Sequence, residues 1–316
     1  MCKLVDLSFQ GLIRVSGPDA RDFLQTQFCN DVAQIDETRH QLNGWCNPKG
    51  RLLAVFRLFV HEGVWVMRMP IELLEPVIKR LRMFVLRSNV TIEDASDTVG
   101  GIGLWGTGSP ALLAGATGLK SAPAPGEVAS NGTLIFLGIP ENNGSRFEIY
   151  GATDDIEDLK GQLSSQITEA TEDAWRLREI QAGLPTVYPS SSEQFVPQMV
   201  NMDLVDALSF SKGCYPGQEI VARTRYLGKL KRRMFRLSID SGTEPEPGQD
   251  VYSTKRENAA MGTIVDAAPG VADKVEALAV LRLDDIGEQD LHIGEPDGPA
   301  ARIEPLPYDP MGTPES

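Results

Sequence analysis

One run of eight residues, K-G-C-Y-P-G-Q-E at positions 212 to 219, constrains this chain more than any other part of it. The run places Cys214 between Gly213 and a Pro216-Gly217 turn, directly ahead of a segment from Gln218 to Tyr226 that has the composition of a helix. Glycine and proline are used where the backbone needs restricted or unusual angles. Their density here predicts one specified path of the chain rather than a generic core segment.

Cys214 is the candidate functional group of this run. Helix N-termini and neighbouring cations favour the reactive thiolate form of a cysteine, and Lys212, Arg223 and Arg225 are close to Cys214 in the sequence. The opposing interpretation is a small buried side chain that fills a glycine-rich turn. The surrounding residues favour a functional thiol.

Upstream of this run, segments typical of strands alternate with segments typical of helices. Residues 11–15 and 52–60 have strand patterns, whereas residues 71–86 carry apolar residues at helical spacing with cations on the other side. Such alternation predicts an α+β domain with helices on the faces of its sheets. Beyond position 228 the segments become short and alternating, with turns such as 241–242, which predicts a small antiparallel β-barrel.

The composition limits the class of protein. The 316 residues carry a net charge of −14, so bulk attraction to nucleic acid or to an anionic membrane is not expected. No basic segment followed by an apolar run opens the chain, and no apolar stretch is long enough to cross a membrane, which predicts a soluble cytoplasmic protein. The cysteines and histidines are scattered, so we expect no stably bound metal. They are Cys2, Cys29, Cys46, Cys214, His40, His61 and His292.

A local cluster of cations stands against this acidic background. Between Arg223 and Arg236 there are seven lysine or arginine residues and no acid. They could form a solvated strand face, or a local site for an anion such as a carboxylate-rich ligand tail or the phosphates of RNA. Direct binding of tRNA through this stretch is therefore an alternative, which the overall charge and the scarcity of aromatic residues disfavour.

A second candidate site lies in a helix predicted from Asp173 to Ala182. Trp175, Arg178 and Gln181 can share one face of this helix. An aromatic ring, a cation and an amide on one face could stack on a flat ring and hydrogen-bond to its edge. The alternative is a core tryptophan with solvated neighbours, and the spacing alone does not choose between them.

Four motifs together carry a resemblance to a known family: N-P-K-G-R at 47–51, W-R-L-R-E-I-Q-A-G-L-P at 175–185, K-G-C-Y-P-G-Q-E at 212–219 and R-I-E-P-L-P-Y at 302–308. In this order they resemble the YgfZ family, tetrahydrofolate-binding relatives of the aminomethyltransferase of the glycine cleavage system. The resemblance spans essentially the whole chain. It implies an aminomethyltransferase-like folate-binding region at 1–228 and a C-terminal β-barrel domain with a proline-rich tail at 229–316.

The resemblance also implies a function. Members of this family bind tetrahydrofolate or a one-carbon derivative and support the assembly or repair of iron-sulfur enzymes, including those that methylthiolate tRNA. Folate and such enzymes are therefore the expected partners of a protein that we expect to be a monomer. Cys214 matches the signature cysteine of the family, and Trp175 matches a tryptophan of its folate site. The other residues that we assign to this site are Arg178, Gln181, Gln10, Tyr215, Gln218, Glu219 and Arg225.

Three places depart from the family pattern. Gln10 stands where a second folate-associated tryptophan is expected, and Gln181 stands where a glutamate is expected. Ala54 and Val55 replace the acidic pair of true aminomethyltransferases, which would act as general acid and base. A folate-dependent one-carbon transferase or demethylase is therefore the alternative function, and the sequence leaves open whether the chain is an enzyme.

Overall fold

A computed structural model describes residues 1–226, 230–240, 243–253, 259–286 and 290–312. The chain forms two compact units, each assembled from separate segments. The first unit contains residues 1–27, 31–43 and 56–175, and the second contains residues 28–30, 44–55 and 176–316. The predicted boundary between 228 and 229 lies outside the described residues, as does the predicted turn at 241–242.

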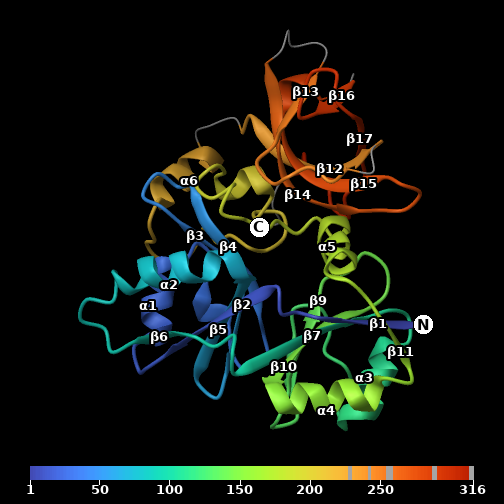
Figure 1. Ribbon diagram of the computed structural model, residues 1–316. Coiled ribbons are helices and arrows are strands. Elements are labelled where there is room, and N and C mark those ends of the chain that lie inside the picture. Colours follow the sequence, from blue (N-terminus) through green and yellow to red (C-terminus); the bar gives the residue numbers. More distant parts are fainter. Residues whose placement is uncertain (227–229, 241–242, 254–258, 287–289, 313–316) are drawn as a thin grey trace. The chain divides into compact units, whose positions relative to one another are not determined.

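Two sheets form the framework of the first unit (Figure 1). The larger sheet contains, in spatial order, β11 (Ile167–Glu169), β1 (Cys2–Asp6), β7 (Val99–Trp105), β10 (Arg146–Ala152), β9 (Ile135–Ile139) and β8 (Val128–Ser130). The smaller sheet contains β3 (Gln41–Cys46), β4 (Leu52–His61), β5 (Val64–Pro70), β2 (Gln10–Ser16) and β6 (Thr91–Asp94). β3 and β4 also supply residues to the second unit.

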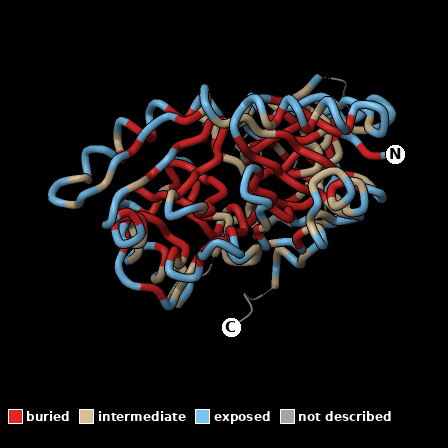
Figure 2. The backbone as a smooth tube through the Cα atoms, turned by 90° about the horizontal axis from the view of Figure 1, so that it is seen from below, coloured by how far each residue is buried: buried red, intermediate tan, exposed pale blue. Residues whose placement is uncertain are grey.

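The strand predicted at 52–60 is buried along almost its whole length. Nine of the ten residues of β4 are buried, which explains why its sequence is a continuous apolar run rather than an alternation. Figure 2 shows how burial varies along the backbone, with buried residues in red and exposed residues in pale blue. A charged residue in such a strand therefore has to find its partners inside the protein.

Helices of the first unit include α1 (Ala20–Gln27), α2 (Leu74–Arg82), α3 (Ser109–Thr117) and α4 (Thr153–Leu163). The helix predicted over 71–86 is shorter than expected, because a 3-10 turn, η2 (Ile71–Leu73), precedes α2 and the regular helix ends at Arg82. Its buried face ends at Leu81, whereas Met83, Phe84 and Leu86 are exposed. Packing against the core therefore does not extend the helix further.

The second unit contains the predicted barrel. The barrel is closed and contains, in spatial order, β12 (Arg232–Ile239), β15 (Val275–Arg282), β14 (Ala260–Pro269), β13 (Asp250–Ser253), β16 (Leu291–Ile293) and β17 (Ala300–Glu304). The described strand pairs of the barrel are antiparallel, and a cluster of apolar side chains fills its interior. Both the α+β class and the C-terminal antiparallel β-barrel are confirmed.

Two helices carry most of the predicted site residues. α6 (Gln218–Tyr226) begins and ends at the predicted residues, and α5 (Glu172–Gln181) is shifted by one residue from the prediction. Gly183, two residues beyond the end of α5, has a φ of +67°, the left-handed conformation that glycine adopts at helix C-termini.

Candidate functional site

Cys214 lies on the surface of the second unit, in the segment that leads into α6. Its side chain is exposed, whereas Lys212 and Tyr215 on either side are buried. The interpretation of Cys214 as a buried filler of the turn is therefore wrong. Two buried anchors instead present an exposed thiol between them.

The 47–51 loop, between β3 and β4, packs against the turn that precedes α6. Gly217 has a φ of +82°, and a Cβ there would come within 2.5 Å of the Asn47 carbonyl oxygen and 2.6 Å of Gly50. Glycine alone suits both this angle and this approach. The Asn47 side-chain oxygen accepts hydrogen bonds from two backbone N–H groups of the loop, at 2.9 and 3.0 Å. Two motifs far apart in the sequence thus pack closely against each other.

Lys212 anchors the segment to the interior of the second unit. Its ammonium donates hydrogen bonds to the carbonyl oxygens of Phe28 and Asn30, at 2.5 and 3.1 Å, and lies 5.4 Å from the ring centroid of Tyr215. The sequence suggested a cation that activates the neighbouring thiol. The structure differs because a buried ammonium must be satisfied by acceptors, and these two carbonyls supply them.

Four more of the predicted residues lie on the same segment or on α6. Burial raises the pKa of the Tyr215 phenol above its ordinary value. The Gln218 amide lies 3.5 Å from the Lys212 carbonyl oxygen, Glu219 is exposed, and the Arg225 guanidinium carbon lies 4.0 Å from the ring centroid of Phe210. Cys214, Tyr215, Gln218, Glu219 and Arg225 therefore share one stretch of the second unit, the segment before α6 and α6 itself.

Arg178 and Gln181 lie on the part of α5 that belongs to the second unit. The Gln181 amide donates a hydrogen bond to the Glu276 carboxylate on β15, at 2.9 Å. Arg178 is half-buried. Gln181 therefore meets a carboxylate here, which suits an amide better than the glutamate that the family pattern predicts at this position.

Trp175 belongs to the core of the first unit. Its side chain is 1% exposed and its ring meets the ring of Trp105 edge-on, with centroids 5.6 Å apart. The Arg146 guanidinium carbon lies 4.9 Å from the Trp175 ring centroid. Among the described residues the indole nitrogen has no hydrogen-bond partner, although it is buried. The ring is placed as the core interpretation predicts, and a contact with folate stays a prediction.

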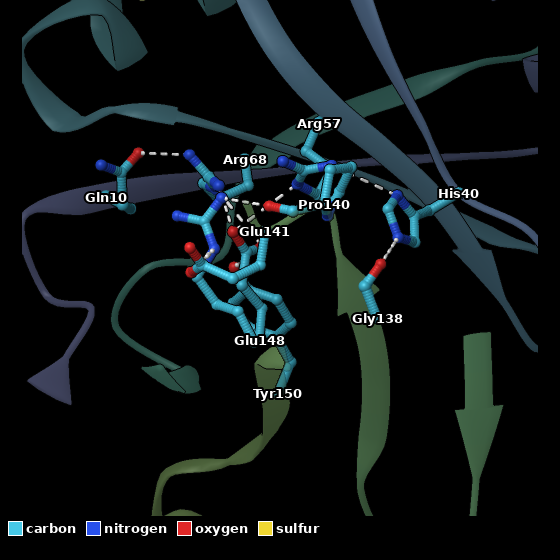
Figure 3. A network of polar contacts seen from close by, with 10 residues as sticks. Gln10, His40, Arg57, Arg68, Gly138, Pro140, Glu141, Glu148 and Tyr150 are labelled. Atoms are coloured by element: carbon cyan, nitrogen blue, oxygen red, sulfur yellow. Dashed lines mark hydrogen bonds and ion pairs between the residues drawn. The ribbon is translucent and has the colours of Figure 1, made fainter. Parts of the chain in front are cut away.

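Gln10 contacts a group of buried charged residues in the first unit, shown in Figure 3. Its side-chain oxygen accepts a hydrogen bond from Arg68 at 3.3 Å, and Gln10 also lines a pocket of about 370 Å³ beside Tyr150. Arg68 on β5 pairs with the Glu148 carboxylate on β10, and Arg57 on β4 lies 3.5 Å from the same carboxylate. Glu148 therefore neutralises two arginines that lie opposite each other on neighbouring strands.

The charges of this group shift the pKa values of its members. Burial alone would raise the pKa of Glu148, but Arg68 and Arg57 outweigh burial and hold it at about 2. Burial and then Arg57 lower the pKa of His40 to about 3. Neutral His40 donates from Nε2 to the Gly138 carbonyl oxygen at 2.8 Å, and its Nδ1 lies 3.4 Å from Arg57. Glu148 is thus ionised and His40 neutral at physiological pH.

Sequence reasoning missed Arg57, Arg68 and Glu148. A signal was present, because each of these charges interrupts an apolar strand, in F-R-L, M-R-M and F-E-I. A single charge in such a strand does not identify its partner, however, since the partner comes from another strand.

The basic stretch from 223 to 236 does not form one uniform surface. Arg233 is buried and makes two hydrogen bonds with the Asp203 carboxylate, at 2.5 and 2.9 Å. Arg236 lies 3.1 Å from the Glu276 carboxylate. Arg223 and Lys231 are exposed, and position 229 lies outside the described residues. At least two of the seven cations therefore have structural partners rather than a free role in anion binding.

Two further features bear on the class of protein. In the part of the chain that the structure describes, no helix combines the length and apolar character that crossing a membrane requires. Within the same residues, no three or more histidine, cysteine or acidic side chains converge into a group that could hold a metal ion.

Comparison with known proteins identifies the family. Residues 1–125 match the family described as the GCVT N-terminal domain. The tRNA-modifying protein YgfZ of Klebsiella pneumoniae is 30% identical over 308 residues, which cover 96% of this chain and 92% of the relative. The tRNA-modifying protein YgfZ of Cronobacter sakazakii is 30% identical over 311 residues, with the same coverage.

A solved structure confirms the fold. The glycine cleavage system aminomethyltransferase T from Bartonella henselae superposes with a TM-score of 0.77 over 99% of this chain and 88% of that protein, at 17% identity. At this identity the likeness shows the fold alone. Because the curated relatives match over nearly their whole length, the chain belongs to the family of the tRNA-modifying protein YgfZ, with an aminomethyltransferase-like fold.

Proposed function

We propose that this protein is a tetrahydrofolate-binding accessory protein that supports the assembly or repair of iron-sulfur enzymes, including those that modify tRNA. Cys214 is its key thiol. The observation that carries the proposal is the exposed thiol of Cys214 in a backbone that Lys212 and Gly217 hold fixed on either side. A thiol presented in this way can meet a partner protein or a bound small molecule without reorganising the segment.

The relatives named as tRNA-modifying proteins support the link to tRNA. The acidic chain and the buried Arg233 favour an indirect role through partner enzymes rather than direct binding of tRNA. We place this work in the cytoplasm, where iron-sulfur enzymes and tRNA meet.

The residues that we propose for the folate contact are Trp175, Arg178, Gln181 and Gln10, together with Tyr215, Gln218, Glu219 and Arg225. Two observations suit such a ligand. The buried indole nitrogen of Trp175 lacks a hydrogen-bond partner among the described residues and could donate to a carbonyl oxygen of the pterin. Gln10 offers both a donor and an acceptor beside a pocket. Bound tetrahydrofolate would supply a carrier for a one-carbon group.

Aminomethyl transfer is not part of the proposal. Ala54 and Val55 are buried apolar residues of β4, where the true aminomethyltransferases have an acidic pair. Neither side chain can act as the general acid or base that amine chemistry on the folate requires. Turnover of methyl- or methylene-tetrahydrofolate by the purified protein would revive the alternative of a one-carbon transferase or demethylase.

A titration with tetrahydrofolate, followed by tryptophan fluorescence, tests the folate part of the proposal. We expect saturable quenching in the wild type, strongly reduced quenching in Trp175→Phe, and retained quenching in the control Trp65→Phe, which removes another buried tryptophan of the first unit. Absence of saturable binding by calorimetry as well as by fluorescence would contradict the folate contact. An equal loss of quenching in Trp175→Phe and Trp65→Phe would contradict the specific role of Trp175.

A further inference from the structure

Two other cysteines, Cys29 and Cys46, meet in the interior of the second unit, directly behind the segment that carries Cys214. Both are buried, at 0% and 1% exposure. An antiparallel bridge joins Phe28 to Trp45, and the N–H of Cys29 donates to the Gly44 carbonyl oxygen at 2.9 Å. The cysteines thus lie on two paired stretches of chain, one residue to either side of the bridge.

The register of this bridge puts both thiols on the same face. Side chains alternate along paired strands, so Cys29 and Cys46 point away from the face of Phe28 and Trp45. The residue opposite Cys29 is Gly44, and a Cβ at that position would lie 3.1 Å from the Cys29 sulfur. Because Gly44 has no side chain, the Cys29 sulfur has room on the face that Cys46 shares, and Cys29 is the first cause of the raised pKa of Cys46.

The Cys214 segment covers this pair. The Tyr215 ring centroid lies 5.4 Å from the Lys212 ammonium. Burial first, and then Cys29 and Cys46, raise the pKa of the Tyr215 phenol. The Lys212 ammonium binds the carbonyl oxygens of Phe28 and Asn30, the residues on either side of Cys29. The segment can therefore act as a cover whose hold on the chain around Cys29 is the ammonium of Lys212.

We propose that Cys29 and Cys46 are a modification site, a dithiol that a peroxide converts into an intramolecular disulfide. The first thiol, as its thiolate, attacks one oxygen of hydrogen peroxide, so that an S–O bond forms, the O–O bond breaks and water leaves after proton transfer. The second thiol attacks the sulfenic sulfur, the S–S bond forms, the S–O bond breaks and a second water leaves. Two thiols lose two electrons in total, and the peroxide gains them.

Burial makes this reaction dependent on opening of the cover. The neighbouring Cys29 and then burial raise the pKa of Cys46, which disfavours the reactive thiolate in the closed protein. The peroxide also has to reach two residues that are buried in the closed protein. The exposed Cys214 should therefore react first, and the pair should react only when the Lys212–Tyr215 segment moves away.

Peptide mapping of the full-length protein tests the proposal. In Cys214→Ser, which removes the exposed competitor, reduced protein is treated with hydrogen peroxide, unfolded, alkylated and digested with trypsin without reduction. Trypsin places Cys29 in the peptide 22–39 and Cys46 in the peptide 40–49. We expect these two peptides to be recovered as one linked species, two hydrogens lighter than their sum, and to separate on reduction. Cys29→Ser in the same background is the control and should give no linked species.

Wild-type protein treated in parallel shows when the peroxide has fully oxidised the exposed Cys214. If the two peptides of Cys214→Ser are recovered separately after the same treatment, each alkylated, the proposal is overturned. Linkage of either peptide to Cys2 or to a second chain rather than between the two would also overturn it.

The role of the cover is tested by the rate of linkage. Lys212→Met keeps the aliphatic stem but removes the hydrogen bonds to the two carbonyls, and should speed linkage about tenfold. Lys231→Met, which removes an exposed ammonium elsewhere in the second unit, should leave the rate unchanged. Equal linkage rates in Lys212→Met and Lys231→Met would contradict the role of the Lys212–Tyr215 segment as a cover. If Lys212→Met does not fold, sub-denaturing urea on Cys214→Ser replaces it, and a linkage rate that does not rise with urea would contradict the same point.

Discussion

The carbonyl oxygen of Asn47 lies where a side chain on Gly217 would begin, since a Cβ there would come within 2.5 Å of that oxygen. The loop after β3 and the turn before α6 are therefore fitted to each other, although 170 positions separate the two residues. This fit determines where Cys214 is presented, because the turn directly follows the thiol.

A methyl group at Gly217 should break this fit. Gly217→Ala combines a strained positive φ with a backbone clash, and should lower the free energy of unfolding by about 1–3 kcal/mol. Gly213→Ala is the matched control, because a Cβ there meets nothing within 4 Å. Urea denaturation of both variants measures the difference. Equal stability of the two variants would show that the turn accommodates a side chain.

Glu148 should be essential for the stability of the first unit. It is fully buried between Arg57 and Arg68, so Glu148→Gln leaves buried cations without their carboxylate and should cost about 3–5 kcal/mol. Glu157→Gln, which affects an exposed ion pair on α4, should cost less than about 1 kcal/mol. Thermal or urea unfolding of the two variants checks this, and a small effect at Glu148 would contradict the network.

The neutral state of His40 should make stability depend on pH. Its pKa is about 3 in the folded protein and 6.5 when unperturbed, so the unfolded chain binds the extra proton between these values. Stability should therefore rise with pH across this window, by at most about 1.4 kcal/mol per pH unit from this group. His40→Gln cannot titrate, so the difference between the wild-type and variant curves isolates His40. If the stability curves of the wild type and His40→Gln run parallel from pH 3 to 6.5, the lowered pKa of His40 is refuted.

Neighbouring arginines of β12 should respond differently to substitution. Arg233 makes a buried bidentate pair with Asp203, and Arg233→Met should cost about 3 kcal/mol or more because the carboxylate stays buried without its partner. Arg232 is half-buried, and Arg232→Met should change stability only slightly. Denaturation midpoints of the two variants measure this. Charge reversals that probe RNA binding should accordingly use Arg232 and spare Arg233.

Local patterns in the sequence predicted α6 and the barrel strands. The helix from Gln218 to Tyr226 follows a Pro-Gly turn, and the barrel strands are short alternating segments between turns, so neighbouring residues carry the necessary information. The extent of α2 was overestimated because apolar residues continue beyond Arg82 while the surface they would pack on does not. Periodicity reports which residues are apolar, and not where the core ends.

The candidate site could be predicted only in part. The motif around Cys214 was visible because its residues are consecutive. The meeting of Cys29 with Cys46, and of Glu148 with Arg57 and Arg68, depends on strand pairing between distant segments, which spacing does not reveal. Lys212 shows the same limit, since its position next to Cys214 in the sequence suggested a role in activation, whereas its ammonium binds carbonyls of another segment.

The central claim is that Cys214 is the working thiol of a protein that supports iron-sulfur enzymes. The most direct test measures methylthiolated tRNA in cells that lack their own YgfZ-family gene and express either wild-type protein or Cys214→Ser. Because Cys214 is exposed, the variant should keep its fold and its tetrahydrofolate affinity. The account predicts that it nevertheless fails to restore methylthiolated tRNA. Restoration to the wild-type level by a stable, folate-binding Cys214→Ser protein would contradict the claim.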